Sequence, residues 1–113
     1  MIKIKRIYEQ VSPNDGKRIL VDRLWPRGIK KEDAAIDEWL REIAPSTKLR
    51  KWYSHDPAKW AEFKKRYKIE LKDRMGIVNR LHTESKKRTI TLLFSAKARK
   101  LNNAEALKEF MER

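Results

Sequence analysis

The sequence predicts an α/β fold: one compact domain with a small mixed sheet of about three strands, a parallel central pair, and four to five packed helices. Two β-type segments lie within the first 25 residues and a third lies near residue 90. Helical patterns fill the long interval between the second and third segments, and such a crossover makes two strands of one sheet parallel. The length of 113 residues suits a single domain, residues 1–113, with one core.

The strands are predicted from their apolar periodicity. Ile2 and Ile4 alternate with lysines, which is typical of an edge strand with one wet face. Turn-forming residues at 12–16 separate this segment from a more apolar one at residues 18–24. The turn also leaves open an antiparallel pairing of the first strand with the second. Residues 89–94 are β-branched and apolar, which predicts a buried third strand.

The first helix is predicted over residues 32–44. Ile36, Trp39, Leu40 and Ile43 fall at i, i+3, i+4 and i+7, which is the spacing of one buried helix face. Proline follows at position 45 and ends the helix. A serine at position 46 is then placed to cap a short helix that runs to about residue 52.

A long helical pattern begins at Asp56 and Pro57, an N-cap residue followed by a proline at the first helical position. Its apolar stripe continues to about residue 81, which at 1.5 Å per residue gives a rod of nearly 40 Å. A domain of this size has a radius of gyration of about 13 Å. We therefore expect the helix to break near Gly76. A final helix is predicted after Asn102 or Asn103, either of which can cap it.

Composition excludes several classes of protein. The chain has no Cys, which removes disulfides and thiolate metal sites and favours a cytoplasmic location. His55 and His82 are 27 residues apart and form no zinc-binding pattern, so no metal and no cofactor are expected. There is no signal peptide and no apolar stretch long enough for a bilayer, so no membrane partner is expected. The oligomeric state is left open.

The chain is strongly basic. There are 29 Lys and Arg against 16 Asp and Glu, a formal net charge of +13. Residues 57–88 alone hold 11 basic and 4 acidic side chains, and Lys65, Lys68 and Lys72 share one helix face. Such a face could track the phosphates of a nucleic acid. It could equally be a solvated surface, partly balanced by i, i+4 pairs such as Glu62 with Arg66.

Polar residues follow the second and third predicted strands. Ligands of parallel α/β sheets usually bind beyond the carboxyl ends of the strands, and a loop that leads into a helix N-terminus favours anions. We therefore expect a phosphate- or carboxylate-bearing ligand to be bound there. The candidate residues are Asp22, Arg23, Trp25, Arg27, Gly28, Ser95, Lys97, Asn102 and Asn103.

Each candidate also has a structural interpretation. The two asparagines can serve only as helix caps, Arg23 and Arg27 can hold Asp22 or backbone carbonyls, and Gly28 can simply permit a turn. Trp52 and His55 belong to a second candidate loop, in which His55 could act as a general acid or base. Nucleophilic catalysis by Ser95 would require that it meets His55 in space.

Five segments and an asparagine pair carry a family resemblance. They are residues 18–28 (RILVDRLWPRG), 39–47 (WLREIAPST), 49–57 (LRKWYSHDP), 63–71, 91–97 (TLLFSAK) and Asn102-Asn103. With these segments the chain resembles the YeaO-like proteins, a family of small bacterial and archaeal proteins catalogued as a domain of unknown function (family number 488). The resemblance implies a compact α/β domain of cytoplasmic origin. It implies no reaction, so whether the protein is an enzyme stays open.

We therefore expect a small anion-binding domain or enzyme, with its pocket at the carboxyl ends of the strands. The alternative is a nucleic-acid-binding module that uses the basic surface of residues 57–88. The first predicts that the candidate residues converge in one hollow. The second predicts a continuous positive surface with steep salt dependence.

Overall fold

A four-stranded parallel sheet organises the chain. The computed structural model describes residues 1–112 and places the strands in the order β1–β4–β2–β3. β4 pairs parallel with both β1 and β2, and the short β3 pairs parallel with β2. The strands are β1 (Ile2–Arg6), β2 (Lys17–Leu20), β3 (Glu38–Trp39) and β4 (Ile90–Phe94). The α/β class and the parallel pairing of the second and third predicted strands are confirmed.

The first strand is an edge strand, as expected, but it does not form a hairpin with β2. It pairs parallel with β4, because every residue of β4 is buried and this apolar strand needs a neighbour on each side. The intervening turn is closed by a capping box between Ser12 and Asp15. Gly16 then turns the chain with φ +62°. A Cβ on Gly16 would lie 2.2 Å from the carbonyl oxygen of Thr89, so only glycine fits there.

The helix predicted over residues 32–44 is wrong. The only α-helix there among the described residues is α1 (Lys31–Ala34), which Ala35 ends in the left-handed conformation with φ +50°, and a 3-10 turn (Arg41–Ile43) follows later in the segment. The chain then runs along the free edge of β2 as β3, where the amide of Leu40 donates to the carbonyl of Leu20 (2.9 Å). Pairing of this edge satisfies backbone groups that a helix would leave open.

The apolar residues of this segment divide between the two faces of the sheet. Ile36 and Trp39 pack against a small cluster on one face, whereas Leu40 and Ile43 join the main core on the other. A helix would have placed all four on one side. The helical spacing of these four residues therefore does not produce a helix, because pairing with β2 determines the conformation of the segment.

The long helical pattern does break, as predicted, although slightly before Gly76. α3 (Trp60–Leu71) and α4 (Met75–Lys87) are joined by a 3-10 turn (Lys72–Arg74), and Gly76 lies inside α4. No helix within residues 1–112 is long and apolar enough to cross a lipid bilayer.

The expected caps are present. Ser46 Oγ accepts from the amide of Leu49 at the start of α2 (Thr47–Tyr53). Asp56 accepts from the amide of Ala58 ahead of α3. Asn102 Oδ1 accepts from the amide of Glu105 at the start of α5 (Asn103–Met111).

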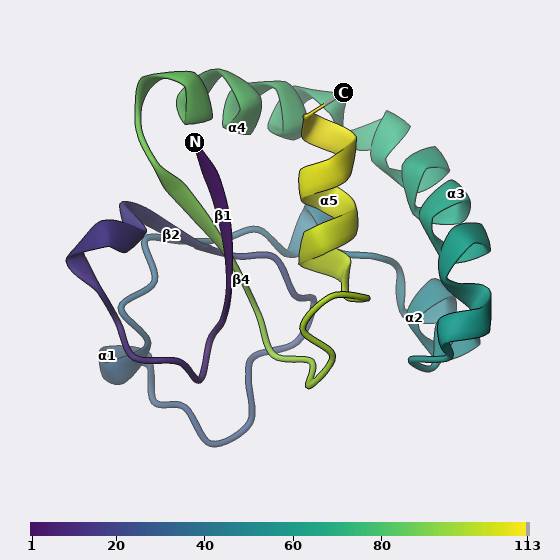
Figure 1. Ribbon diagram of the computed structural model, residues 1–113, viewed down its shortest axis with the longest axis horizontal. Coiled ribbons are helices and arrows are strands. Elements are labelled where there is room, and N and C mark those ends of the chain that lie inside the picture. Colours follow the sequence, from purple (N-terminus) through teal and green to yellow (C-terminus); the bar gives the residue numbers. More distant parts are fainter. Residues whose placement is uncertain (113) are drawn as a thin grey trace.

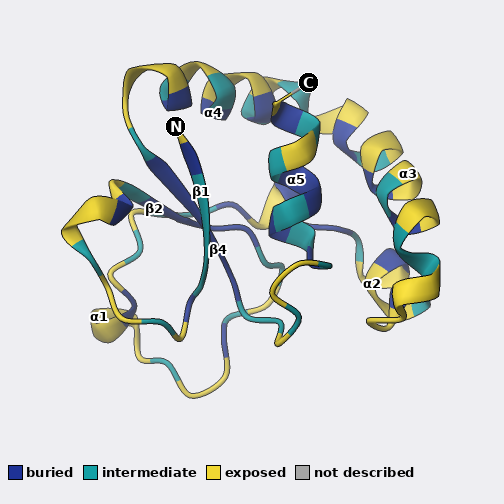
Figure 2. Ribbon diagram, viewed as in Figure 1, coloured by how far each residue is buried: buried dark blue, intermediate teal, exposed yellow. Residues whose placement is uncertain are grey.

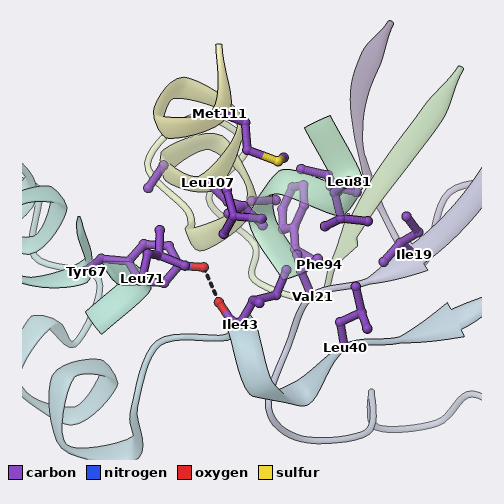
Figure 3. Packing of buried hydrophobic residues seen from close by; sticks show 14 of the residues in the cluster. Ile19, Val21, Leu40, Ile43, Tyr67, Leu71, Leu81, Phe94, Leu107 and Met111 are labelled. Atoms are coloured by element: carbon purple, nitrogen blue, oxygen red, sulfur yellow. Dashed lines mark hydrogen bonds between the residues drawn. The ribbon is translucent and has the colours of Figure 1, made fainter. Parts of the chain in front are cut away.

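The two faces of the sheet are covered differently. In Figure 1, α5 and α3 lie to the right of the strands, and the loop that carries α1 lies to the left. The helices are buried where they face the sheet and exposed on their outer surfaces (Figure 2). Figure 3 shows Leu107 and Met111 of α5 packed with Phe94, Leu81 and Val21 in the main core.

Buried and half-buried charges meet at the amino end of β2. Arg18 is 4% exposed, and its guanidinium donates to Asp15 Oδ2 (2.5 Å) and to the carbonyls of Ala34 (3.1 Å) and Ala35 (2.9 Å). Lys5 also contacts Asp15 (3.0 Å). Burial alone would raise the pKa of Asp15, but hydrogen bonds from the Ser12 backbone, Lys5 and Arg18 together hold it below its usual value.

Lys17, the first residue of β2, forms a second ion group. Its Nζ lies 2.7 Å from Glu38 and 2.9 Å from Glu84, and Arg80 contacts Glu38 at 2.9 Å. Hydrogen bonds to Glu38 and Glu84 raise the pKa of Lys17. The Arg80 guanidinium lowers the pKa of Glu38, against the effect of burial and with help from Lys17.

Candidate functional site

The site is built around Asp22, which follows β2. Asp22 Oδ2 accepts from the backbone amide (2.9 Å) and the hydroxyl (2.7 Å) of Ser95, which follows β4. Asp22 Oδ1 accepts from Asn103 Nδ2 (3.0 Å) at the start of α5. One carboxylate therefore ties together the carboxyl ends of two strands and a helix N-terminus.

Arg23 and Trp25 shape the loop after β2. Arg23 donates from Nε to the carbonyl of Pro45 (3.2 Å) and from Nη2 to that of Ala44 (3.2 Å), which is the structural role considered for it above. The indole of Trp25 donates to the carbonyl of Ile29 (2.7 Å). The Trp25 bond closes the loop on itself, and the Arg23 bonds tie the loop to the segment that precedes α2.

A pocket of about 580 Å³ opens where these strand ends, their loops and α2 meet. Eight of the eleven candidate residues line it: Asp22, Arg23, Trp25, Arg27, His55, Ser95, Asn102 and Asn103. Three candidates are not among its lining residues. Lys97 is exposed in the loop after β4, and Gly28 forms a turn with φ +80°. The ring of Trp52 is contacted by the cations of Arg66 (4.0 Å to the ring centroid) and Lys59 (5.1 Å).

Part of the lining was not among the residues predicted from the sequence. Tyr8 follows β1, and Thr47, Arg50, Lys51 and Tyr53 come from α2. The available signal was the apolar pair Leu49 and Tyr53, both buried in the core. This pair sets the face of α2 that packs inward, and thereby the side on which its cations lie.

The pocket carries an excess of positive charge. Arg23, Arg27, Arg50 and Lys51 line it, against Asp22 as the single carboxylate among the described lining residues. The side chains of Arg27, Arg50 and Lys51 are exposed and form no ion pair within residues 1–112. Asp22 is already held by three hydrogen bonds from Ser95 and Asn103. The free cations are therefore available to an anion from solution.

His55 lies on the pocket wall, and no side chain or backbone group among residues 1–112 forms a hydrogen bond that orients its ring. It is exposed and adopts the left-handed conformation with φ +57°. Its ring centroid is 6.1 Å from that of Tyr53, whereas the neighbouring Asp56 is engaged as a helix cap. Ser95 lines the same pocket, but its hydroxyl proton points to Asp22 rather than to an imidazole. A serine nucleophile activated by His55 is not assembled here.

The lysines of the nucleic-acid alternative lie away from the pocket. Lys65, Lys68 and Lys72 are exposed on α3 and the turn after it, form no ion pair within the described chain, and do not line the pocket. Of the pairs expected on that helix, Glu62 with Arg66 is present (3.1 Å). Within residues 1–112 no group of three or more His, Asp or Glu side chains is placed to hold a metal ion.

Comparisons with known proteins match the whole chain. The family described as the inactive DUF488-N3 subclade matches residues 1–113. The uncharacterised protein YeaO of Escherichia coli is 46% identical over 110 residues, which cover 97% of this chain and 96% of YeaO. Uncharacterised proteins of Mycobacterium tuberculosis and Mycobacterium bovis are 47% identical over 72 residues, covering 64% of this chain and 61% of theirs. No solved structure is significantly similar to the chain.

Proposed function

The chain belongs to the YeaO-like DUF488 family, in the subclade described as inactive, and from that premise we propose that it binds a small anionic ligand without turning it over. The ligand carries a phosphate or carboxylate group. Its site is the pocket at the carboxyl ends of β2 and β4.

One observation carries this proposal. Three exposed cations, Arg27, Arg50 and Lys51, line a pocket whose single described carboxylate is already hydrogen-bonded. Charge-assisted hydrogen bonds to an anion are stronger than neutral ones, and a hollow shields them from solvent better than a convex surface does. Arginine also matches the geometry of phosphate and carboxylate oxygens.

Binding is favoured over catalysis by the side chains that chemistry would need. His55 has no hydrogen-bond partner within residues 1–112 that would orient its ring, and Ser95 Oγ is committed to Asp22. A general base normally needs both an orienting partner and reach to the reacting proton. The description of the subclade as inactive agrees with this interpretation.

The test compares two double variants with the same loss of charge. Inorganic phosphate, citrate and ribose 5-phosphate are titrated by calorimetry into the wild type, Arg27→Gln/Arg50→Gln and Lys65→Gln/Lys68→Gln. A hydrogen bond to a charged group contributes about 1.5–3 kcal/mol, so loss of two pocket arginines weakens binding by more than tenfold. The α3 variant keeps the wild-type affinity.

Equal weakening in both variants would show that net charge alone attracts the anion, and the pocket would lose its role. No binding of any probe to the wild type at millimolar concentration would reject the anion site outright.

A nucleic-acid surface is the alternative, supported by Lys65, Lys68 and Lys72, which are exposed and form no ion pair with any of residues 1–112. For duplex DNA, each phosphate neutralised adds about 0.9 to the slope of log affinity against log salt. Replacing all three lysines by glutamine would then reduce the slope by about 2–3. If that variant loses DNA binding while Arg27→Gln/Arg50→Gln retains it, the α3 face rather than the pocket is the functional site.

A further inference from the structure

Tyr8 is an unusual residue in the pocket wall. It is 44% exposed, yet its position is fixed at two points. Its hydroxyl donates to the carbonyl of Arg27 (2.8 Å), and the guanidinium of Arg6 lies over its ring, 4.9 Å from the centroid. A large aromatic side chain is therefore held in place while almost half of its surface stays open to solvent.

The cation behind the ring is itself anchored. Arg6 donates from Nε to the carbonyl of Ala96 (2.8 Å) and from Nη2 to that of Ser95 (3.2 Å). Ser95 and Ala96 line the same pocket. Because Arg6 occupies one ring face, a second flat group would stack on the opposite face of Tyr8.

The pocket is also much larger than an inorganic anion. Its volume of about 580 Å³ equals roughly twenty water molecules at about 30 Å³ each, whereas phosphate has only five heavy atoms. The remaining wall includes apolar side chains, among them Leu24, which is 62% exposed. Pockets of this size usually hold a molecule with both an apolar body and a few polar groups.

We infer that the ligand joins its anionic group to a planar aromatic or heteroaromatic ring, as a nucleoside monophosphate does. Tyr8 stacks on the ring, while Arg27 and Arg50 hold the anion. This inference rests on the proposed anion site and adds the chemical class of the ligand. Ring stacking on an exposed, preordered aromatic residue raises affinity by about tenfold.

The experiment separates the ring from the anion. Adenosine 5′-monophosphate, uridine 5′-monophosphate, ribose 5-phosphate and adenosine are titrated into the wild type, Tyr8→Leu and Tyr8→Phe, with Ile69→Ala as an exposed apolar control on α3. At least one nucleotide should bind about tenfold more tightly than ribose 5-phosphate. Tyr8→Leu should erase that difference and leave ribose 5-phosphate unchanged, whereas Tyr8→Phe and Ile69→Ala keep it.

The results that would overturn the ring inference differ from those that would overturn the anion site. Equal affinity of the wild type for both nucleotides and ribose 5-phosphate would overturn the ring inference while the anion site stands. Equal loss in Tyr8→Phe and Tyr8→Leu would assign the effect to the hydroxyl and also overturn it. Absence of ribose 5-phosphate and phosphate binding would instead reject the anion site. If Tyr8→Leu does not fold, the ligand series on the wild type and Tyr8→Phe still decides the question.

Discussion

The two ends of β2 differ in how their charged side chains are paired. At the amino end, Lys17 and Arg18 are matched by carboxylates, and the Arg18 side chain is nearly inaccessible to water. At the carboxyl end, the cations that surround the strand outnumber the single carboxylate, Asp22. The matched end stabilises the fold, whereas the unmatched end is where we propose that a ligand binds. Charge count alone does not distinguish these roles; pairing and burial do.

The largest expected effect is the loss of stability when the ion pair at the matched end is broken. Arg18→Met removes one partner of a buried ion pair and leaves the Asp15 carboxylate and two carbonyls short of donors. Urea denaturation should show a loss of about 3–5 kcal/mol in the free energy of unfolding. The exposed Lys100→Met is the matched control and should stay within about 0.5 kcal/mol. An equally small loss for Arg18→Met would show that the pair contributes little to stability.

A smaller effect is expected at the unmatched end. Asp22→Asn turns one acceptor oxygen into a donor and sets it against the donors of Ser95 and Asn103. The free energy of unfolding should fall by about 1–3 kcal/mol. Phosphate affinity of the folded protein, measured by calorimetry, should rise or stay constant because the carboxylate is gone. A fall in affinity would mean that Asp22 contacts the ligand.

The third effect is a pH dependence at the matched end. Glu38 has a lowered pKa in the fold, so on acidification the unfolded chain takes up its proton first. Its stabilising contribution is complete above the ordinary value of 4.5 and is lost as the pH falls through the lower pKa of the folded protein. Glu38→Gln should therefore lower stability by about 0.5–1 kcal/mol at pH 7.

The same variant supplies the check. The stabilities of the wild type and Glu38→Gln should converge as the pH falls below 4.5 and through the lowered pKa of Glu38 in the folded protein. A difference that is constant from pH 7 to pH 3 would mean that packing rather than ionisation is lost.

The smallest expected effect is the loss of stability when an exposed ion pair is removed. Glu62→Gln removes the pair with Arg66 on α3, in which both side chains are about half exposed. An i, i+4 pair in solvent contributes about 0.3–0.5 kcal/mol, and salt should abolish the difference. A loss as large as that of Arg18→Met would show that burial does not separate the two classes of pair.

Elements with strong local signals were predictable from the sequence. The caps at Ser46, Asp56 and Asn102 and the apolar β4 all formed where expected, because each depends on neighbours within a few residues. The helix over residues 32–44 failed for the opposite reason. Its competitor is the open edge of β2 together with the buried Arg18, and neither can be inferred from the segment itself.

The residues of the candidate site also divide into those that could be predicted from the sequence and those that could not. Asp22, Ser95 and Asn103 were predicted because parallel strands end on one side of a sheet, a rule that needs only the strand positions. Tyr8 and Arg50 were missed because their place in the pocket depends on how β1 and α2 pack in three dimensions. Trp52 was a candidate ligand-binding residue, but it is not among the pocket-lining residues, and its ring contacts the cations of Lys59 and Arg66 instead.

The pairing of β1 with β4 also sets the order of events during synthesis on the ribosome. β1 is synthesised before the other strands, yet its only strand partner within residues 1–112 is β4, which begins at Ile90. β2 needs the same strand for most of its pairing. Apart from the two-residue β2–β3 contact, no part of the sheet can assemble until the last quarter of the chain has emerged. Folding is thus a late event governed by long-range contacts, which slows it relative to a helical bundle of equal length.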